Sequence, residues 1–154
     1  MNNEQIPSKR GSYVLMLELK RVRALRVGRL GEVTLPAGVY AYAGSAFGSG
    51  GLRARLGRHL RGDGALHWHL DYVRAVAKAR TCFYTVSDTP LECAWSQALA
   101  ALPGATIPVV GFGASDCRSG CGAHLIALSS AVDFDSIQRA LVRLSGQCLR
   151  YDFI

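Results

Sequence analysis

Strand-forming residues come in closely spaced runs over the first third of the chain, and this spacing constrains the fold more than any other feature. The longest run, Tyr13 to Leu19, carries Glu18 as its only charge. Three shorter runs follow at residues 25–27, 33–35 and 39–43, separated by a basic turn and by glycine and proline breaks. Runs this close in sequence favour pairing between neighbours and predict an antiparallel meander.

The rest of the chain alternates helical patterns with single strands. Helices are predicted at residues 52–61, 66–79, 89 to about 102 and 135–144, and strands at 81–86 and 125–128. A length of 154 residues fits one domain. We therefore predict a single α+β domain with a small antiparallel sheet flanked by helices. Residues 1–10 are expected to form a flexible arm, and residues 129–154 a C-terminal helical extension of the domain.

The charge of the chain points towards phosphate. Eighteen basic residues against eleven acidic ones leave a formal charge of +7, and fifteen of the basic residues are arginines. The planar guanidinium fork matches phosphate oxygens, where a lysine offers a point charge. This balance is typical of a nucleic-acid partner, although solvated arginines on a basic surface would give the same composition.

Composition also excludes some classes of protein. No apolar run approaches the ~20 residues that a membrane span needs, and the polar residues 1–10 do not resemble a signal peptide. Five cysteines are an odd number for a disulfide framework, so reduced thiols are expected. We therefore expect a cytoplasmic protein, associated with the nucleoid if its source is bacterial or archaeal, and no membrane partner.

Two short tags and several longer strings carry a resemblance to a known family. Gly11-Ser12-Tyr13 begins the first strand, and Tyr42-Ala43-Gly44 ends a later one. The longer strings are Pro36-Ala37-Gly38, Gly44-Ser45-Ala46, Arg58-His59-Leu60, His67-Trp68-His69-Leu70-Asp71-Tyr72, Gly111-Phe112-Gly113 and Ser115-Asp116-Cys117. Together they resemble the GIY-YIG nuclease superfamily over residues 11–128, in the branch called domain-of-unknown-function family 123. That branch also occurs fused to endonuclease III-type repair enzymes.

The resemblance implies a divalent-metal-dependent endonuclease acting on DNA more readily than on RNA, with a repair enzyme as a possible partner. It implies catalytic roles for Tyr13, Tyr42, Arg55 and His59, and a metal-ligand role for Glu92. The metal would be Mg²⁺ or Mn²⁺, which suit a hard carboxylate with waters. The chain departs from the family pattern at Ser12 and Ala43, which replace isoleucines. It also lacks a late asparagine, whose role is vacant or passes to Ser115 or Asp116.

The basic residues of the helix predicted at 52–61 point to different faces of that helix. Arg55 and His59 stand four residues apart and share one face, whereas Arg53 lies about 200° from Arg55. A phenol with a pKa near 10 is a poor base alone, and His59 could help a tyrosine to ionise. Arg58 and Arg61 are interpreted as contacts to the nucleic-acid backbone or as solvated charges. Nucleic-acid contacts are assigned to Arg53, Arg58, Arg61, His67 and His69.

Glu92 supports two interpretations. Thr89-Pro90-Leu91-Glu92 matches a capping box, in which the carboxylate would bond back to the Thr89 N–H. A side chain engaged in that way would not face a metal. The family resemblance instead assigns Glu92 to the metal.

Two further groups combine polar side chains at short spacing. His67, His69 and Asp71 share one face only in an extended segment, and in a helix His69 points away from the other two. Cys117, Cys121 and His124 offer three ligands for Zn²⁺, with His67, His69 or Cys93 as the fourth. Reduced structural thiols or a redox-sensitive pair are the alternative.

Three hypotheses about function follow: a metal-dependent endonuclease, a non-cleaving nucleic-acid-binding module that keeps the nuclease fold, and a zinc- or thiol-based accessory protein. A carboxylate among phosphate-binding cations favours the first over the second, because pure binding would not require it.

Binding to nucleic acid should weaken steeply as the salt concentration rises, because phosphate contacts release counterions. Arg58→Ala or Arg61→Ala should weaken binding to all sequences equally, as loss of a backbone contact does. Fluorescence anisotropy with several labelled DNAs over a salt series measures both effects. Salt-independent binding, or none at low salt, would count against a nucleic-acid partner.

Overall fold

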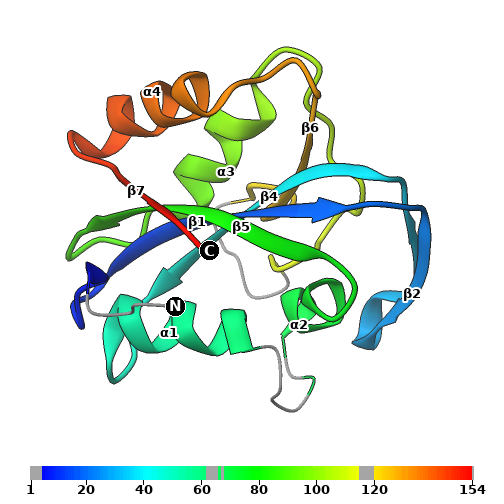
Figure 1. The fold of residues 1–154 in the computed structure, drawn as a ribbon, viewed down its shortest axis with the longest axis horizontal. Coiled ribbons are helices and arrows are strands. Elements are labelled where there is room, and N and C mark those ends of the chain that lie inside the picture. Colours follow the sequence, from blue (N-terminus) through cyan, green and yellow to red (C-terminus); the bar gives the residue numbers. More distant parts are fainter. Residues whose placement is uncertain (1–4, 62–65, 67, 115–119, 154) are drawn as a thin grey trace.

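A five-stranded antiparallel sheet forms the middle layer of the protein (Figure 1). The computed structural model describes residues 5–61, 66, 68–114 and 120–153. The strand order is β6-β4-β1-β5-β7. The strands of this sheet are β1 (Gly11–Leu19), β4 (Gly38–Ala46), β5 (Lys78–Val86), β6 (Leu125–Leu128) and β7 (Leu149–Asp152). The predicted α+β class and antiparallel sheet are confirmed.

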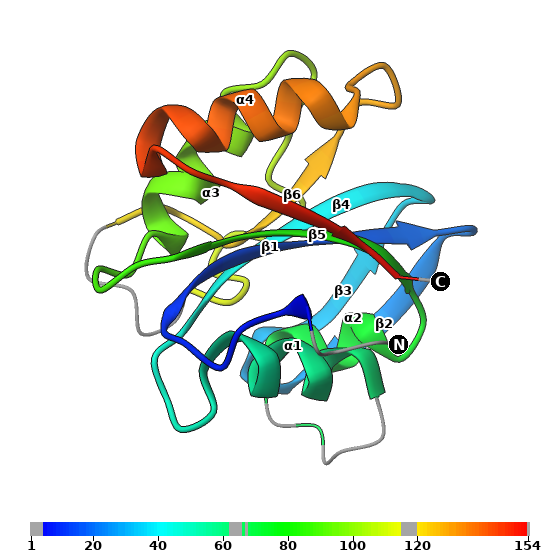
Figure 2. The same cartoon turned by 60° about the vertical axis from the view of Figure 1, so that its left-hand side comes forward.

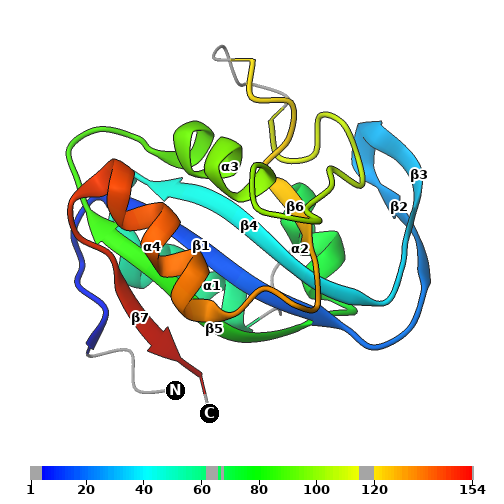
Figure 3. The ribbon, with the colours of Figure 1, turned by 90° about the horizontal axis from the view of Figure 1, so that it is seen from above.

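Helices cover both faces of this sheet (Figures 1 and 3). On one side lie α1 (Gly51–Arg61) and α2 (His69–Arg74), and on the other α3 (Glu92–Ala100) and α4 (Phe134–Ser145). Alternation along β1 divides its side chains between the two layers: Leu15 and Leu17 pack on the α1 side, Val14 and Met16 on the α3 side. The central strand is therefore buried on both faces.

The predicted meander between β1 and β4 is a hairpin with its own small sheet. β2 (Arg23–Val27) and β3 (Gly31–Leu35) pair only with each other, around a 3-10 turn at Gly28–Leu30. The hairpin projects from one end of the main sheet (Figure 3). β1 and β4 therefore pair directly, from Gly11 opposite Ala46 to Leu19 opposite Gly38.

The segment expected to be a flexible arm makes specific contacts in its described part, residues 5–10. The Ile6 side chain is fully buried in the core beside α1. The carbonyl oxygens of Pro7 and Lys9 accept hydrogen bonds from the N–H groups of Arg53 and Leu52, at 3.1 and 2.9 Å. These are donors of the first helical turn that have no partner within the helix, so the segment caps α1.

One predicted helix is shorter in the structure, and one observed strand was not predicted. The helix predicted at 66–79 is confined to His69–Arg74, because β5 begins at Lys78 and pairs its first residues with Leu17 and Glu18 of β1. Pairing with the sheet overrides the helical periodicity there. β7 was not predicted: its four residues are mostly exposed and show no alternation, and the strand exists because it pairs with β5 (Figure 2). The C-terminal segment is thus a helix followed by an edge strand.

No helix among the described residues is both long and apolar enough to cross a membrane.

Candidate active site

The two tagged strands bring Tyr13 and Tyr42 onto the same face of the sheet. Tyr13 of β1 lies opposite Gly44, and Tyr42 of β4 lies opposite Leu15, two positions along. Both phenol side chains are buried, with 1% of Tyr13 and 9% of Tyr42 exposed. The Tyr13 ring passes directly over Gly44, so a Cβ at position 44 would stand 2.5 Å from the Tyr13 hydroxyl oxygen. Position 44 must therefore be a glycine, because any side chain there would overlap Tyr13.

Tyr13 is hydrogen bonded to His59 of α1, with 2.7 Å between Oη and Nε2. The imidazole is 2% exposed, and its Nδ1 has no hydrogen-bond partner among the described residues. Burial, and after it the positive charge of Arg55, together lower the pKa of His59 to about 3. His59 is therefore neutral at physiological pH and can accept a hydrogen bond from the Tyr13 hydroxyl at Nε2.

Both tyrosines are neutral for the same reason. Burial raises the pKa of Tyr42 to about 12 and that of Tyr13 further still. The guanidinium of Arg55 acts against this in both cases, because a nearby positive charge favours the phenolate. Arg55 is thus the group in the site that would stabilise an ionised phenol.

Trp68 holds two arginines of α1 in place. The guanidinium carbons of Arg55 and Arg58 both stack over its ring, 4.3 and 4.0 Å from the ring centroid. Arg55 also donates from Nη1 to the Ser45 carbonyl oxygen at 3.1 Å. Arg58 instead forms two hydrogen bonds to the Asp71 carboxylate, at 3.1 and 3.2 Å. Arg55 is thereby turned towards the tyrosines, while Arg58 is neutralised by its own partner.

Glu92, the first residue of α3, is held by two serines. The Ser45 hydroxyl donates to Glu92 Oε2, and the Ser12 and Ser45 hydroxyl oxygens stand 2.8 Å apart. Because the Ser45 proton goes to Glu92, the Ser12 hydroxyl donates to Ser45 and accepts from the Leu91 N–H at 2.9 Å. A chain of hydrogen bonds therefore runs from the start of α3 through β1 and β4 to its own carboxylate.

Of the two interpretations of Glu92, the capping box at Thr89 is wrong. The residue before α3 is Leu91, no side chain caps the helix there, and the Thr89 N–H bonds to the Ser87 hydroxyl. Pro90 and Leu91 keep Thr89 outside the helix. The carboxylate of Glu92 is consequently directed to β4 and not back to residue 89.

These side chains meet in one pocket at the end of the sheet. Its lining comprises Tyr13, Tyr42, Gly44, Ser45, Arg55, His59, Trp68, Glu92, Gly113 and His124. Of the ten, two are phenols, two are imidazoles, one is a guanidinium and one is a carboxylate. Below, "the cleft" means this pocket.

The residues assigned to nucleic-acid contacts lie at different places. Arg53 points away from the cleft lining and donates from Nε to the Ile6 carbonyl oxygen at 2.8 Å, as its helical angle from Arg55 indicated. Arg61 is exposed at the end of α1. His69 accepts the Gly113 N–H at Nδ1, at 2.7 Å, and so holds the loop before β6. His67 lies outside the described residues.

A second group of possible metal ligands borders the cleft. Cys93, Cys121 and His124 place one ligand atom each within 4.8 Å of one another and could bind a metal ion. Cys121 and His124 belong to the predicted zinc set. Cys117, with the candidate positions Ser115 and Asp116, lies outside the described residues. The first turn of α3 brings Cys93 to this group. Cys93 was one of the three residues considered as a fourth zinc ligand.

Sequence reasoning missed three residues of the site. Trp68 and Ser45 were named only within strings of the family resemblance, and Ser12 only as a replacement for isoleucine. The serines could have been noticed together, since Ser12 and Ser45 each adjoin a tag residue, but only the strand register makes them neighbours. For Trp68 the signal is its place between two histidines, close in sequence to the arginine-rich helix.

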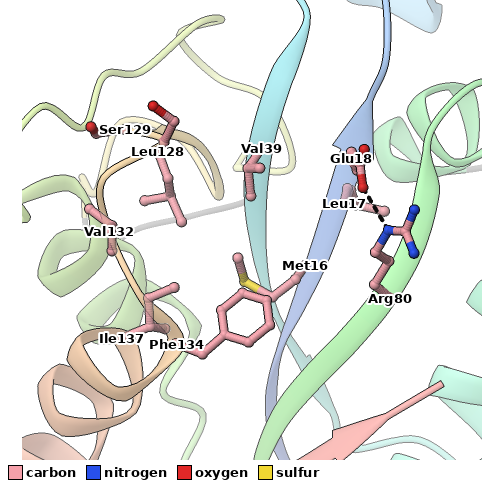
Figure 4. Close-up of a pocket in the computed structure, with 11 residues that line it drawn as sticks. Met16, Leu17, Glu18, Val39, Arg80, Leu128, Ser129, Val132, Phe134 and Ile137 are labelled. Atoms are coloured by element: carbon pink, nitrogen blue, oxygen red, sulfur yellow. Dashed lines mark hydrogen bonds and ion pairs between the residues drawn. The ribbon is translucent and has the colours of Figure 1, made fainter.

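A second, apolar pocket lies on the α4 side of the sheet (Figure 4). Met16, Phe134 and Ile137 line it, and its charged residues, Glu18 and Arg80, are hydrogen bonded to each other at 2.6 Å. Its two charged side chains are thus occupied by each other, and the rest of its lining is mostly apolar. The cleft is the candidate active site.

Comparison with protein families matches residues 12–146 to the domain of unknown function DUF123. No curated protein and no solved structure matches the chain.

Gly44→Ala should disturb the site more than any glycine substitution in open space. The added methyl group would overlap the Tyr13 hydroxyl, so Tyr13 must leave His59, and the free energy of unfolding should fall by roughly 1–3 kcal/mol. Gly48→Ala is the matched control, because nothing lies within 4 Å of its Cβ. Urea unfolding of both variants measures the difference, and equal stabilities would contradict the close approach of Tyr13 to Gly44.

His59 should make the protein sensitive to acid. Its pKa is about 6.5 in the unfolded chain and about 3 in the folded one, so the unfolded state binds the proton first as the pH falls. Its contribution to stability is complete above about pH 6.5 and decreases towards about pH 3, by up to about 1.4 kcal/mol per pH unit. Urea unfolding of wild type and His59→Gln over this range measures it. Parallel stability curves would show that His59 titrates normally.

Proposed function

Because the chain belongs to the DUF123 family, whose description assigns no function, we infer an activity from the cleft itself: a divalent-metal-dependent endonuclease that hydrolyses phosphodiester bonds in DNA. The observation that carries this proposal is the convergence of Tyr13, Tyr42, Arg55, His59 and Glu92 on one pocket. The five come from two strands and two helices. Their resemblance to the GIY-YIG nuclease set supports the same reaction.

Arg55 is suited to bind the reacting phosphate. Its guanidinium is the positive charge in the described lining of the cleft, and Trp68 and the Ser45 carbonyl hold it in place. A phosphoryl group gains negative charge on its oxygens in the transition state. A fixed guanidinium stabilises that charge without having to reorganise.

The Tyr13–His59 pair is suited to orient the attacking water. With His59 neutral, Nε2 accepts a hydrogen bond from the Tyr13 hydroxyl, and the phenol oxygen keeps its lone pairs for a water molecule in the cleft. Burial and the charge of Arg55 make His59 too weak a base to take up a proton, so Tyr13 holds the water by a hydrogen bond while the proton of the attacking water leaves to solvent. Tyr42 lies beside this pair and narrows the space that water can occupy.

Glu92 is suited to hold Mg²⁺ or Mn²⁺. Mg²⁺ is commonly bound through one or two carboxylates, with waters and substrate phosphate completing its shell. Glu92 is the carboxylate in the described lining of the cleft, and Ser45 orients it through Oε2. When bound, such an ion polarises the phosphoryl oxygens and favours ionised water.

A neighbouring hollow continues from Arg55 along the same helix. It is lined by Ala46, Gly48, Ser49, Gly51, Ala54, Arg55, Arg58 and Trp68, and so shares Arg55 and Trp68 with the cleft. We place the next phosphate of the DNA strand there. This path, together with the +7 charge, fits a DNA partner, and a repair enzyme is a possible second partner in the cytoplasm or nucleoid.

Glu92→Gln should separate catalysis from stability. The amide oxygen can still accept from Ser45, so the unfolding temperature should stay within a few degrees of wild type. The lost negative charge should lower metal-dependent cleavage by orders of magnitude. Cleavage of labelled duplex, nicked and branched DNAs is measured with Mg²⁺, Mn²⁺ or EDTA.

Glu32→Gln is the matched control, since Glu32 is an exposed carboxylate on the β2–β3 hairpin. It should leave cleavage unchanged. Wild-type protein that binds DNA in a salt-dependent way but cleaves none of these substrates would favour the non-cleaving binding module. Full activity in Glu92→Gln would remove Glu92 from the metal site.

A further inference from the structure

A compact set of sulfur and nitrogen atoms lies behind the carboxylate of Glu92. The Nε2 atom of His124 stands 3.1 Å from Cys121 Sγ and 3.5 Å from Cys93 Sγ. A tetrahedral zinc ion, with bonds of about 2.3 Å to sulfur and about 2.0 Å to nitrogen, separates such ligands by about 3.5 Å. The two distances from His124 are therefore close to the spacing that one ion would impose, and all three ligand atoms lie within 4.8 Å of one another.

The histidine is held in an orientation that suits metal binding. Its backbone N–H donates to the Phe112 carbonyl oxygen at 2.8 Å, and its own carbonyl accepts from the Ala43 N–H at 2.9 Å. These two bonds fix the backbone of His124 so that Nε2 of its side chain faces both sulfur atoms.

The donor set selects the kind of metal. Two thiols and an imidazole suit Zn²⁺, whereas Mg²⁺ and Mn²⁺ prefer oxygen. Cys121 and His124 are 9% and 6% exposed, so an ion between them would be largely shielded from solvent. The three residues come from two segments, since Cys93 lies in α3 and the other two precede β6.

We propose that Cys93, Cys121 and His124 bind one zinc ion, which ties the loop before β6 to the first turn of α3. A fourth coordination position remains, which water occupies in zinc sites with three protein ligands. The ion would be distinct from the one at Glu92, and it would act as a positioning site. Cys93 directly follows Glu92, and His124 lines the cleft beside it, so the zinc would hold one wall of the cleft against another.

Zinc content tests this proposal without any nucleic acid, so its outcome is independent of the proposed nuclease activity. Wild type, freed of loosely held metal by a weak chelator, should retain one zinc per chain by elemental mass spectrometry. Cys93→Ser and Cys121→Ser should each lose zinc to the same chelator. Cys148→Ala is the control: Cys148 is buried among the side chains beside α4 and should be dispensable for zinc.

Two further measurements on wild type remain informative if a cysteine variant does not fold. Cobalt substitution should give the visible bands of a tetrahedral ion and a thiolate-to-cobalt charge-transfer band. Zinc should protect Cys93 and Cys121 from alkylation, as read by peptide mass spectrometry. A wild-type chain without zinc, unchanged zinc retention in Cys93→Ser, or equal alkylation of Cys93 with and without zinc would overturn the proposal.

Discussion

The direct pairing of β1 with β4 is the constraint on which the site depends. It places Tyr13 over Gly44, Tyr42 two positions along the same face, and Ser12 beside Ser45. A shift of β4 by one residue in this register would send Tyr42 to the α3 side of the sheet and away from Tyr13, because strand side chains alternate. The hairpin of β2 and β3 forms a separate sheet, so it connects the two strands without coming between them.

The cleft also buries two ionisable side chains, Tyr13 and His59, whose charged forms are destabilised by the loss of water. Each of the two therefore stays neutral. Arg55 lowers the pKa of both, and so disfavours protonated His59 while favouring ionised Tyr13. One cation, Arg55, thus shifts the pKa of both members of the pair, and Trp68 and the Ser45 carbonyl keep it in place.

Predictions from local patterns succeeded where the pattern and the tertiary contacts agree. The shared face of Arg55 and His59, and the divergence of Arg53, followed from helical geometry alone. They failed where a partner strand intervened: residues 78–79 of the helix predicted at 66–79 belong to β5. The capping box, one of the two interpretations of Glu92, fails because Ser45 binds the carboxylate. Residues 5–10, expected to be a flexible arm, hold the N-terminus of α1 through the carbonyls of Pro7 and Lys9.

The sequence by itself determined the antiparallel strands, the basic face of α1 and the identities of the tyrosines, arginine and carboxylate, because these depend on periodicity and residue type. Only the tertiary structure decided which of them meet. The link from Leu91 through Ser12 and Ser45 to Glu92 spans 33 to 79 positions, and Cys93 reaches His124 across 31. Contacts at such separations leave no periodic signal in a sequence. They arise because strand register and helix packing bring the ends of β1, β4, β6 and α3 together at one end of the sheet.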